Sequence, residues 1–207
     1  MGRNSGGVVN INHSNGNSAK VQVALNGSRS LSTIKDKTTY NEIFRGISRF
    51  HSVLGVREKS VRLADLDSMN ALGVTFISGK DGKSTGILLN QRFFDRKKQT
   101  IINDIKKNQY NSGFKNVTNA PLQHTITHEL AHATWNASMK SSKARAAGME
   151  ITKLYHVWRK DKKKKGYGTY GESSVSEFWA EAVTKAIHGK ADKYTRVIKR
   201  IAKKYKL

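Results

Sequence analysis

The chain has 207 residues, which suggests a single domain, and a formal charge of +23 from 38 lysines and arginines against 15 aspartates and glutamates. It contains no cysteine, which excludes disulfides, cysteine-ligated zinc and thiol nucleophiles. It has no apolar run of roughly 18 residues and no apolar segment near its start. We therefore expect no membrane contact, no signal peptide, and a protein that is cytoplasmic on synthesis.

The first half of the chain predicts an arm, a helix and several strands. Residues 1–36 are rich in glycine, asparagine and serine, and we interpret them as a flexible arm. From Tyr40 apolar residues recur at helical spacing as far as Gly55, a residue that favours a helix end. Alternating apolar and polar residues predict a strand over 60–67.

Two more predicted strands are followed by helices. Segments 70–79 and 84–90 predict strands joined by a turn at Asp81-Gly82. Asn119, with Pro121 shortly after it, is a helix start signal. The segments with helical spacing are 92–110, 122–139, 143–160, 174–189 and 191–207. Strands in the first half and helices in the second indicate an α+β fold.

The sharpest motif is His128-Glu129-Leu130-Ala131-His132, within the predicted helix 122–139. Positions i and i+4 of a helix lie on one face, about 6 Å apart along the axis, so two imidazoles can bind one zinc ion at roughly 2.0–2.1 Å. Glu129 is turned by about 100° from His128 and can lie beside the ion, within reach of its water molecule. The motif predicts one Zn²⁺ per chain, with His128 and His132 as ligands and Glu129 as general base.

A zinc site of this kind needs a third protein ligand. The longer form of the motif, with a downstream glycine and a third histidine, is excluded because Trp135 and Ser138 stand at those positions. Glu177 and Glu181 share one face of the predicted helix 174–189, among core-type residues where a carboxylate needs a cation or strong hydrogen bonds. We expect Glu177 to be the ligand and Glu181 to support a ligand histidine. The alternative is that both carboxylates are solvated.

Three neighbouring aromatic residues have weaker signals. His124 extends the series of histidines, but it is about 12 Å along the helix axis from His132, too far for both to bind one tetrahedral ion. We expect His124 to be exposed or to lie next to a ligand. Trp135 and Trp179 are expected to pack between the two helices that carry the ligands.

Together these motifs resemble a known family. The His128–His132 motif, then Tyr170-Gly171, then the 176–182 segment Ser-Glu-Phe-Trp-Ala-Glu-Ala resemble the catalytic domain of the anthrax-lethal-factor-like zinc metallopeptidases, a branch of the gluzincins. The resemblance covers roughly residues 40–190, and its specific motifs lie within 120–135 and 167–183. It departs from the family at Ala131, where a glycine is usual.

The resemblance implies a zinc endopeptidase that acts on a peptide or protein. It implies a zincin-like α+β domain over 37–190, with a small mixed or antiparallel sheet, then the active-site helix, then a C-terminal helical part; 191–207 would be a basic helix or tail. It implies the ligands and base named above, with Tyr170 as donor to the oxyanion, although Tyr167 in the same loop competes for that role. It also implies that strand 84–90 is the sheet edge that holds extended substrate.

The setting of the protein has alternatives. Similar domains occur in phage head proteins, so the resemblance adds packaging in a phage virion as an expectation. A toxin or effector protease that cuts a host protein is a further alternative.

The basic segments have two interpretations. Such a charge exceeds the roughly 2–8 that solubility requires. It indicates either solvated helix faces or a functional surface, which would bind phosphate groups without base specificity or attract an acidic substrate. The alternative function is therefore a nucleic-acid-associated protein that uses a zincin fold as scaffold. The candidate contact residues are Lys162, Lys163, Lys164, Lys165, Lys199, Arg200, Lys203 and Lys204.

Overall fold

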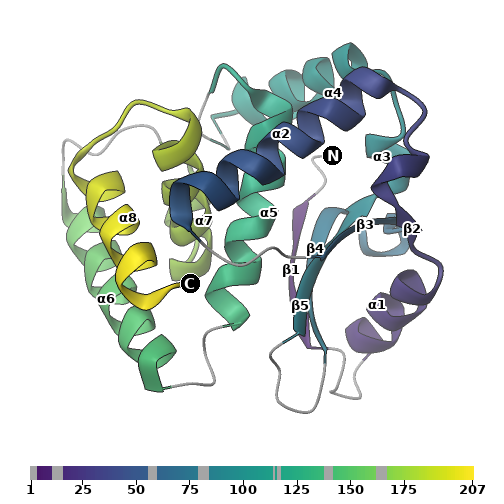
Figure 1. Cartoon of the computed structure of the whole chain (residues 1–207). Coiled ribbons are helices and arrows are strands. Elements are labelled where there is room, and N and C mark those ends of the chain that lie inside the picture. The colour runs from purple at the N-terminus through teal and green to yellow at the C-terminus, as the bar shows by residue number, and fades with distance from the viewer. Residues whose placement is uncertain are drawn as a thin grey trace.

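The computed structural model describes residues 4–10, 16–55, 60–78, 84–113, 115, 118–137, 142–161 and 167–207. In this part of the chain a five-stranded mixed sheet packs against helices, which confirms the predicted α+β class (Figure 1). The strands are β1 (Asn4–Asn10), β2 (Arg29–Ser30), β3 (Ser60–Ala64), β4 (Ala71–Ser78) and β5 (Ser84–Asn90).

The spatial order of the strands is β1-β4-β5-β3-β2. β4 and β5 pair antiparallel, with Thr75 opposite Ile87, whereas β3 joins β5 in parallel and β1 joins β4 in parallel. The expectation that strand 84–90 forms an edge is therefore wrong, because β3 covers one side of β5 and β4 covers the other. The predicted turn at Asp81-Gly82 lies outside the described residues.

The two faces of the sheet bury different residues because side chains alternate along a strand. Ile87 and Leu89 of β5 belong to the main core, together with residues of α2 (Lys37–Leu54) and α5 (Pro121–Ala137). Leu88 packs in a second cluster with Val21 of α1 (Gly16–Asn26). Figure 1 shows α5 on one side of the sheet and α1 on the other. α5 thus contacts both β4 and β5.

Local signals explain several helix limits. The Asp36 carboxylate accepts a hydrogen bond from the Thr39 backbone N–H at the start of α2. α2 ends at Gly55, whose φ of 64° is the left-handed conformation that glycine adopts readily. α5 begins at Pro121, which lacks the N–H that a helix start leaves unpaired. Between them lie α3 (Gln91–Phe94), α4 (Lys98–Ile105) and a π-helical turn (Lys106–Tyr110).

The second half of the chain forms α6 (Ser142–Lys160), α7 (Val175–His188) and α8 (Lys193–Tyr205), grouped on the side of α5 away from the sheet (Figure 1). Three aromatic rings hold this group together: Phe178 lies 4.9 Å from Trp158 and 5.7 Å from Tyr167, between ring centroids. α7 starts at Ser174, whose hydroxyl accepts the Glu177 backbone N–H. The aromatic contacts hold α7 against α6.

The two ends of the chain contribute regular structure. Within 1–36, predicted as a flexible arm, the structure has β1, α1, β2 and a 3₁₀ helix (Leu31–Thr33), whereas residues 1–3 and 11–15 lie outside the described part. Within 191–207 it has α8, whose start is a reciprocal capping box between Asp192 and Thr195. None of the described helices is long and apolar enough to cross a bilayer.

Candidate metal centre

His128 and His132 lie on successive turns of α5 and face each other. Their Nε2 atoms are 3.2 Å apart, and their rings are nearly perpendicular, at 81°. Both residues are buried, with exposed fractions of 0% and 1%. The helical spacing of the motif therefore produces the convergence of imidazole nitrogens that it predicts.

α7 supplies the carboxylate that faces this pair. The indole N–H of Trp179 donates to the Ala131 carbonyl over 3.0 Å and joins α7 to α5. Trp135 lies beside Trp179, with ring centroids 6.4 Å apart, so both tryptophans are between these helices as expected. Glu177, on the first turn of α7, then places its Oε2 atom 3.2 Å from the Nε2 atoms of both histidines.

The three atoms form a triangle whose sides are all 3.2 Å. Ligands bound tetrahedrally at roughly 2.0–2.1 Å lie about 3.3–3.4 Å from one another, so this spacing fits a single small ion. Glu177 Oε2 is buried, and its polar neighbours at 3.2 Å are the two imidazole nitrogens, an arrangement that suits an ion shared by all three atoms. His128, His132 and Glu177 form a cluster that can hold a metal ion.

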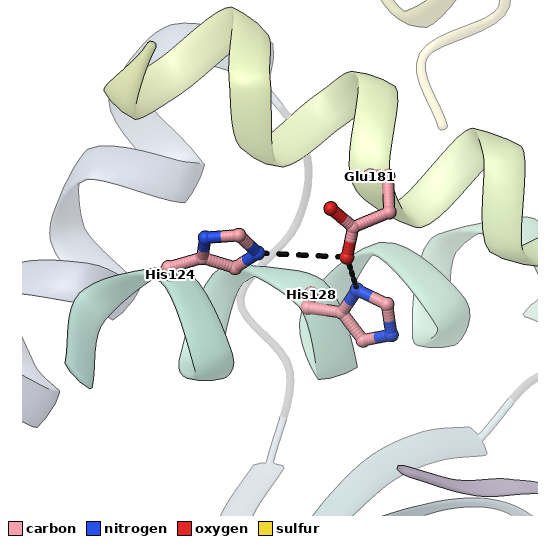
Figure 2. A group of neighbouring side chains, drawn as sticks. All are labelled: His124, His128 and Glu181. Atoms are coloured by element: carbon pink, nitrogen blue, oxygen red, sulfur yellow. Dashed lines mark hydrogen bonds and ion pairs between the residues drawn. The ribbon is translucent and has the colours of Figure 1, made fainter. Parts of the chain in front are cut away.

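The second nitrogen of each imidazole faces an oxygen atom. His128 Nδ1 lies 2.9 Å from Glu181 Oε1 (Figure 2), and His132 Nδ1 lies 3.0 Å from Ser176 Oγ. A proton on Nδ1, directed at these oxygens, leaves the Nε2 lone pair free for an ion. Ser176 had no signal in the sequence beyond its place directly before Glu177.

The buried carboxylates are held in their ionised form. Burial alone would raise the pKa of Glu177, but hydrogen bonds from His128 and His132 outweigh it and keep that pKa well below its usual value. Burial also opposes ionisation of Glu181, but its contacts with His124 and His128 outweigh burial and lower its pKa. Burial and the charge of Lys115 act to lower the pKa of His128, but the contacts with Glu177 and Glu181 outweigh them and raise it. Protons therefore compete with an ion for His128.

Glu129 is fully buried, and neither of its carboxylate oxygens has a hydrogen-bond partner in the described part of the chain. Its side chain lies against β4, where a Cβ atom on Gly73 would be 2.7 Å from Glu129 Cγ and 2.9 Å from Cδ. Gly73 therefore provides the space that this carboxylate occupies. Burying a carboxylate without hydrogen-bond partners costs free energy, which is consistent with a side chain placed to face an ion or to accept a proton during a reaction. The sequence analysis did not single out Gly73.

Tyr170 lies beside the centre. Its ring stacks on His128, with centroids 5.7 Å apart and planes inclined by 20°. It belongs to the 3₁₀ helix Tyr170–Glu172 that precedes α7. The competing Tyr167 is buried and donates its hydroxyl to Asp192, 3.2 Å away. Of the two tyrosines, Tyr170 is therefore the one next to the candidate ligands.

Two further groups surround the centre. His124 is 1% exposed and its Nε2 lies 3.5 Å from Glu181 Oε1, so it is a buried neighbour of the ligand set and is not exposed. His124, His128 and Glu181 form a second cluster that can hold a metal ion. Lys115, which the sequence analysis missed, is also buried; its Nζ lies 5.8 Å from the Tyr170 ring centre without a hydrogen-bond partner among the described residues.

The structure thus brings the predicted His128, Glu129, His132, Tyr170, Glu177 and Glu181 into one neighbourhood. The basic residues are elsewhere: Lys199, Arg200, Lys203 and Lys204 are exposed on α8, and Lys162, Lys163, Lys164 and Lys165 lie outside the described residues. Comparison of the chain with protein-family models, curated proteins and solved structures finds no match. A function must therefore be argued from the site itself.

Proposed function

We propose that the protein is a zinc-dependent endopeptidase. The observation that carries this proposal is the 3.2 Å triangle of His128 Nε2, His132 Nε2 and Glu177 Oε2. Next to it in the helix is the Glu129 carboxylate, which has no hydrogen-bond partner among the described residues. Two imidazoles and one carboxylate leave the fourth corner of a tetrahedron open, which is the ligand set of catalytic zinc. The resemblance to the lethal-factor-like gluzincins supports the same assignment.

The residues of the chain then have distinct roles. A bound zinc ion would polarise the scissile carbonyl and lower the pKa of the attacking water. Glu129 accepts a proton from that water and delivers it to the leaving amine, because its carboxylate has no competing hydrogen bond among the described residues. Tyr170 donates its hydroxyl to the developing oxyanion from its position beside His128. Glu181 and Ser176 keep the two imidazoles in the orientation that binds an ion.

We place an extended substrate along β4 of the sheet. Extended peptides bind readily by adding a strand to a sheet edge. β4 is the strand that touches Glu129, through Gly73, and β1 lies along its outer side. A peptide or protein substrate that adds to β4 would therefore take the place of β1.

The first test measures metal content and cleavage together. Protein purified without added zinc should contain one zinc ion per chain and cleave members of a peptide library. Glu129→Gln preserves the volume of the side chain, and should retain zinc while kcat falls by about 10²–10⁴-fold. Glu150→Gln, on α6, is the matched control and should leave kcat unchanged. A wild-type chain that binds no zinc, or binds it without cleaving any peptide, would contradict the proposal.

A second candidate function, binding of nucleic acid, is favoured by the surface of α8. Tyr194, Ile198 and Ile201 are buried, and the opposite face exposes Lys199, Arg200 and Lys203, which form no ion pair with the described residues. Lys193 and Lys204, by contrast, pair with Asp161 and Glu150. Three exposed cations on one face of a chain with a charge of +23 suit a phosphate backbone.

Salt dependence tests this second function. Replacement of Lys199, Arg200 and Lys203 by glutamine should reduce the slope of log affinity against log salt, for a duplex of random sequence, by up to about 2.7. The control Lys193→Gln should change this slope by less than the replacement of any one of these three residues, because Lys193 pairs with Asp161. Absence of binding at low salt would eliminate nucleic acid as a partner without affecting the peptidase proposal.

A further inference from the structure

A chain of buried polar groups continues behind the candidate metal centre. The Thr118 hydroxyl lies 3.2 Å from the Tyr110 hydroxyl, which lies 3.1 Å from His124 Nδ1. His124 Nε2 lies 3.5 Å from Glu181 Oε1, and the same oxygen lies 2.9 Å from His128 Nδ1 (Figure 2). The exposed fraction of each of these residues is at most 7%. The polar groups therefore have one another, rather than bulk water, as partners.

The donors and acceptors along this chain have a consistent direction. Burial raises the pKa of Tyr110, which remains a phenol that can donate to His124 Nδ1. Burial lowers the pKa of His124, so its imidazole is neutral and keeps one proton, on Nε2, directed at Glu181. Glu181 then accepts from His124 on one side and faces His128 Nδ1 on the other. Each group fixes the orientation of the next.

We propose that His124, backed by Tyr110, is a positioning residue of the metal centre: it holds the Glu181 carboxylate where Glu181 can orient the His128 imidazole toward an ion. This inference rests on the proposed metal site, but it does not require peptidase activity. The groups that orient the ligands would then include His124 and Tyr110, which do not touch the ion and lie on the opposite side of Glu181.

The competing explanation is a second ion bound by His124, His128 and Glu181 themselves. An ion there would need the Nδ1 lone pair of His128, in addition to the Nε2 lone pair that faces Glu177, and thus an imidazolate with no proton on either nitrogen. Direct hydrogen bonding needs only neutral imidazoles. The two explanations predict different metal contents, two ions per chain or one.

The experiment compares two replacements of His124 in the full-length chain. Glutamine places an N–H near the position of the histidine Nε2 atom, whereas leucine removes the donor. His124→Leu should weaken zinc binding about 10-fold, at the lower end of the effects seen for groups around a metal ligand. His124→Gln should bind zinc within about 2-fold of wild type, a rescue expected only if the donated hydrogen bond matters. Affinity is measured by competition with a chelator, and the absorption spectrum of the Co²⁺-substituted chain reports the ligand geometry.

The background variant Glu181→Gln separates positioning from general packing. If His124 acts through Glu181, His124→Leu should cause no further loss of zinc affinity in that background. His156→Leu, at an exposed position on α6, is the matched control and should not change zinc affinity. If His124→Leu does not fold, Tyr110→Phe removes one hydroxyl and should weaken zinc binding about 3-fold, a smaller share of the same effect.

Three results would overturn the inference: unchanged zinc affinity in His124→Leu, an equal loss in His124→Gln, or two zinc ions per wild-type chain. Zinc binding without peptide cleavage would contradict only the proposed function. Normal cleavage together with unchanged affinity in His124→Leu would contradict only the role of His124.

Discussion

Gly73→Ala perturbs the proposed general base without touching a metal ligand. The added Cβ atom would lie 2.7 Å from Glu129 Cγ, and the three nearest atoms to it all belong to Glu129. Carbon atoms approach comfortably to about 3.5 Å, so the Glu129 side chain must move by about 0.8 Å. A displacement of about 1 Å can reduce a reaction rate by about 10²-fold. We expect kcat to fall by that order while the zinc content stays at one per chain.

The assay for Gly73→Ala combines metal analysis, peptide cleavage and thermal unfolding. Forcing an extra methyl group into this packed site should also cost about 1–3 kcal/mol of stability. Gly27→Ala is the matched control, because the nearest atom to its added Cβ would be 3.7 Å away, an ordinary contact. A wild-type kcat in Gly73→Ala would show that Glu129 does not act from the position that the structure gives it.

Three other predictions concern the metal, pH and β1. Removal of zinc with a chelator should lower the melting temperature, because an ion present at 100 times its dissociation constant stabilises the fold by about 2.7 kcal/mol; an unchanged melting temperature would argue against a bound ion. Burial, aided by the charge of Arg49, lowers the pKa of His188 to about 4. In the unfolded chain His188 has an ordinary histidine pKa, so as the pH falls it binds a proton in the unfolded state before it does so in the folded state. The free energy of unfolding should therefore fall by up to about 3 kcal/mol as the pH drops from about 6.5 to 4. Urea unfolding of His188→Gln should show a smaller decrease over this window, and an equal decrease would exclude His188 as its source. The double change Val8→Pro/Val9→Pro removes backbone donors from β1 and should raise kcat/KM for extended peptides, whereas an unchanged value would show that β1 and substrate do not compete.

The candidate site was partly predictable because its strongest signals are local. Two histidines one helical turn apart must share a face, and carboxylates among apolar residues of a helix indicate a buried charge. The environment of His124 could not be predicted, because its partners Tyr110 and Glu181 are 14 and 57 positions away. Gly73 had no signal for the same reason, since its neighbour Glu129 is on another element.

Strand order was the weakest part of the prediction of the fold. The apolar alternation of 84–90 correctly indicated a strand, but it does not specify which strands lie on its two sides. β3 returns beside β5 in parallel and makes it an interior strand, and β1 pairs outside β4 from a segment of glycine, asparagine and serine that has little tendency to form strands. Long-range pairing decides both, and a local pattern contains no information about it.

The candidate ligands come from two helices that are distant in the chain, since Glu177 follows His132 by 45 positions and α6 lies between them. Closing this loop costs conformational entropy before an ion can contact all three groups. Capture of the ion should therefore follow the docking of α7 on α5 during refolding, and excess zinc should slow unfolding more than it accelerates folding. How tightly the ion is retained would then depend not only on the ligands but also on the contact of Trp179 with Ala131, which joins the two helices.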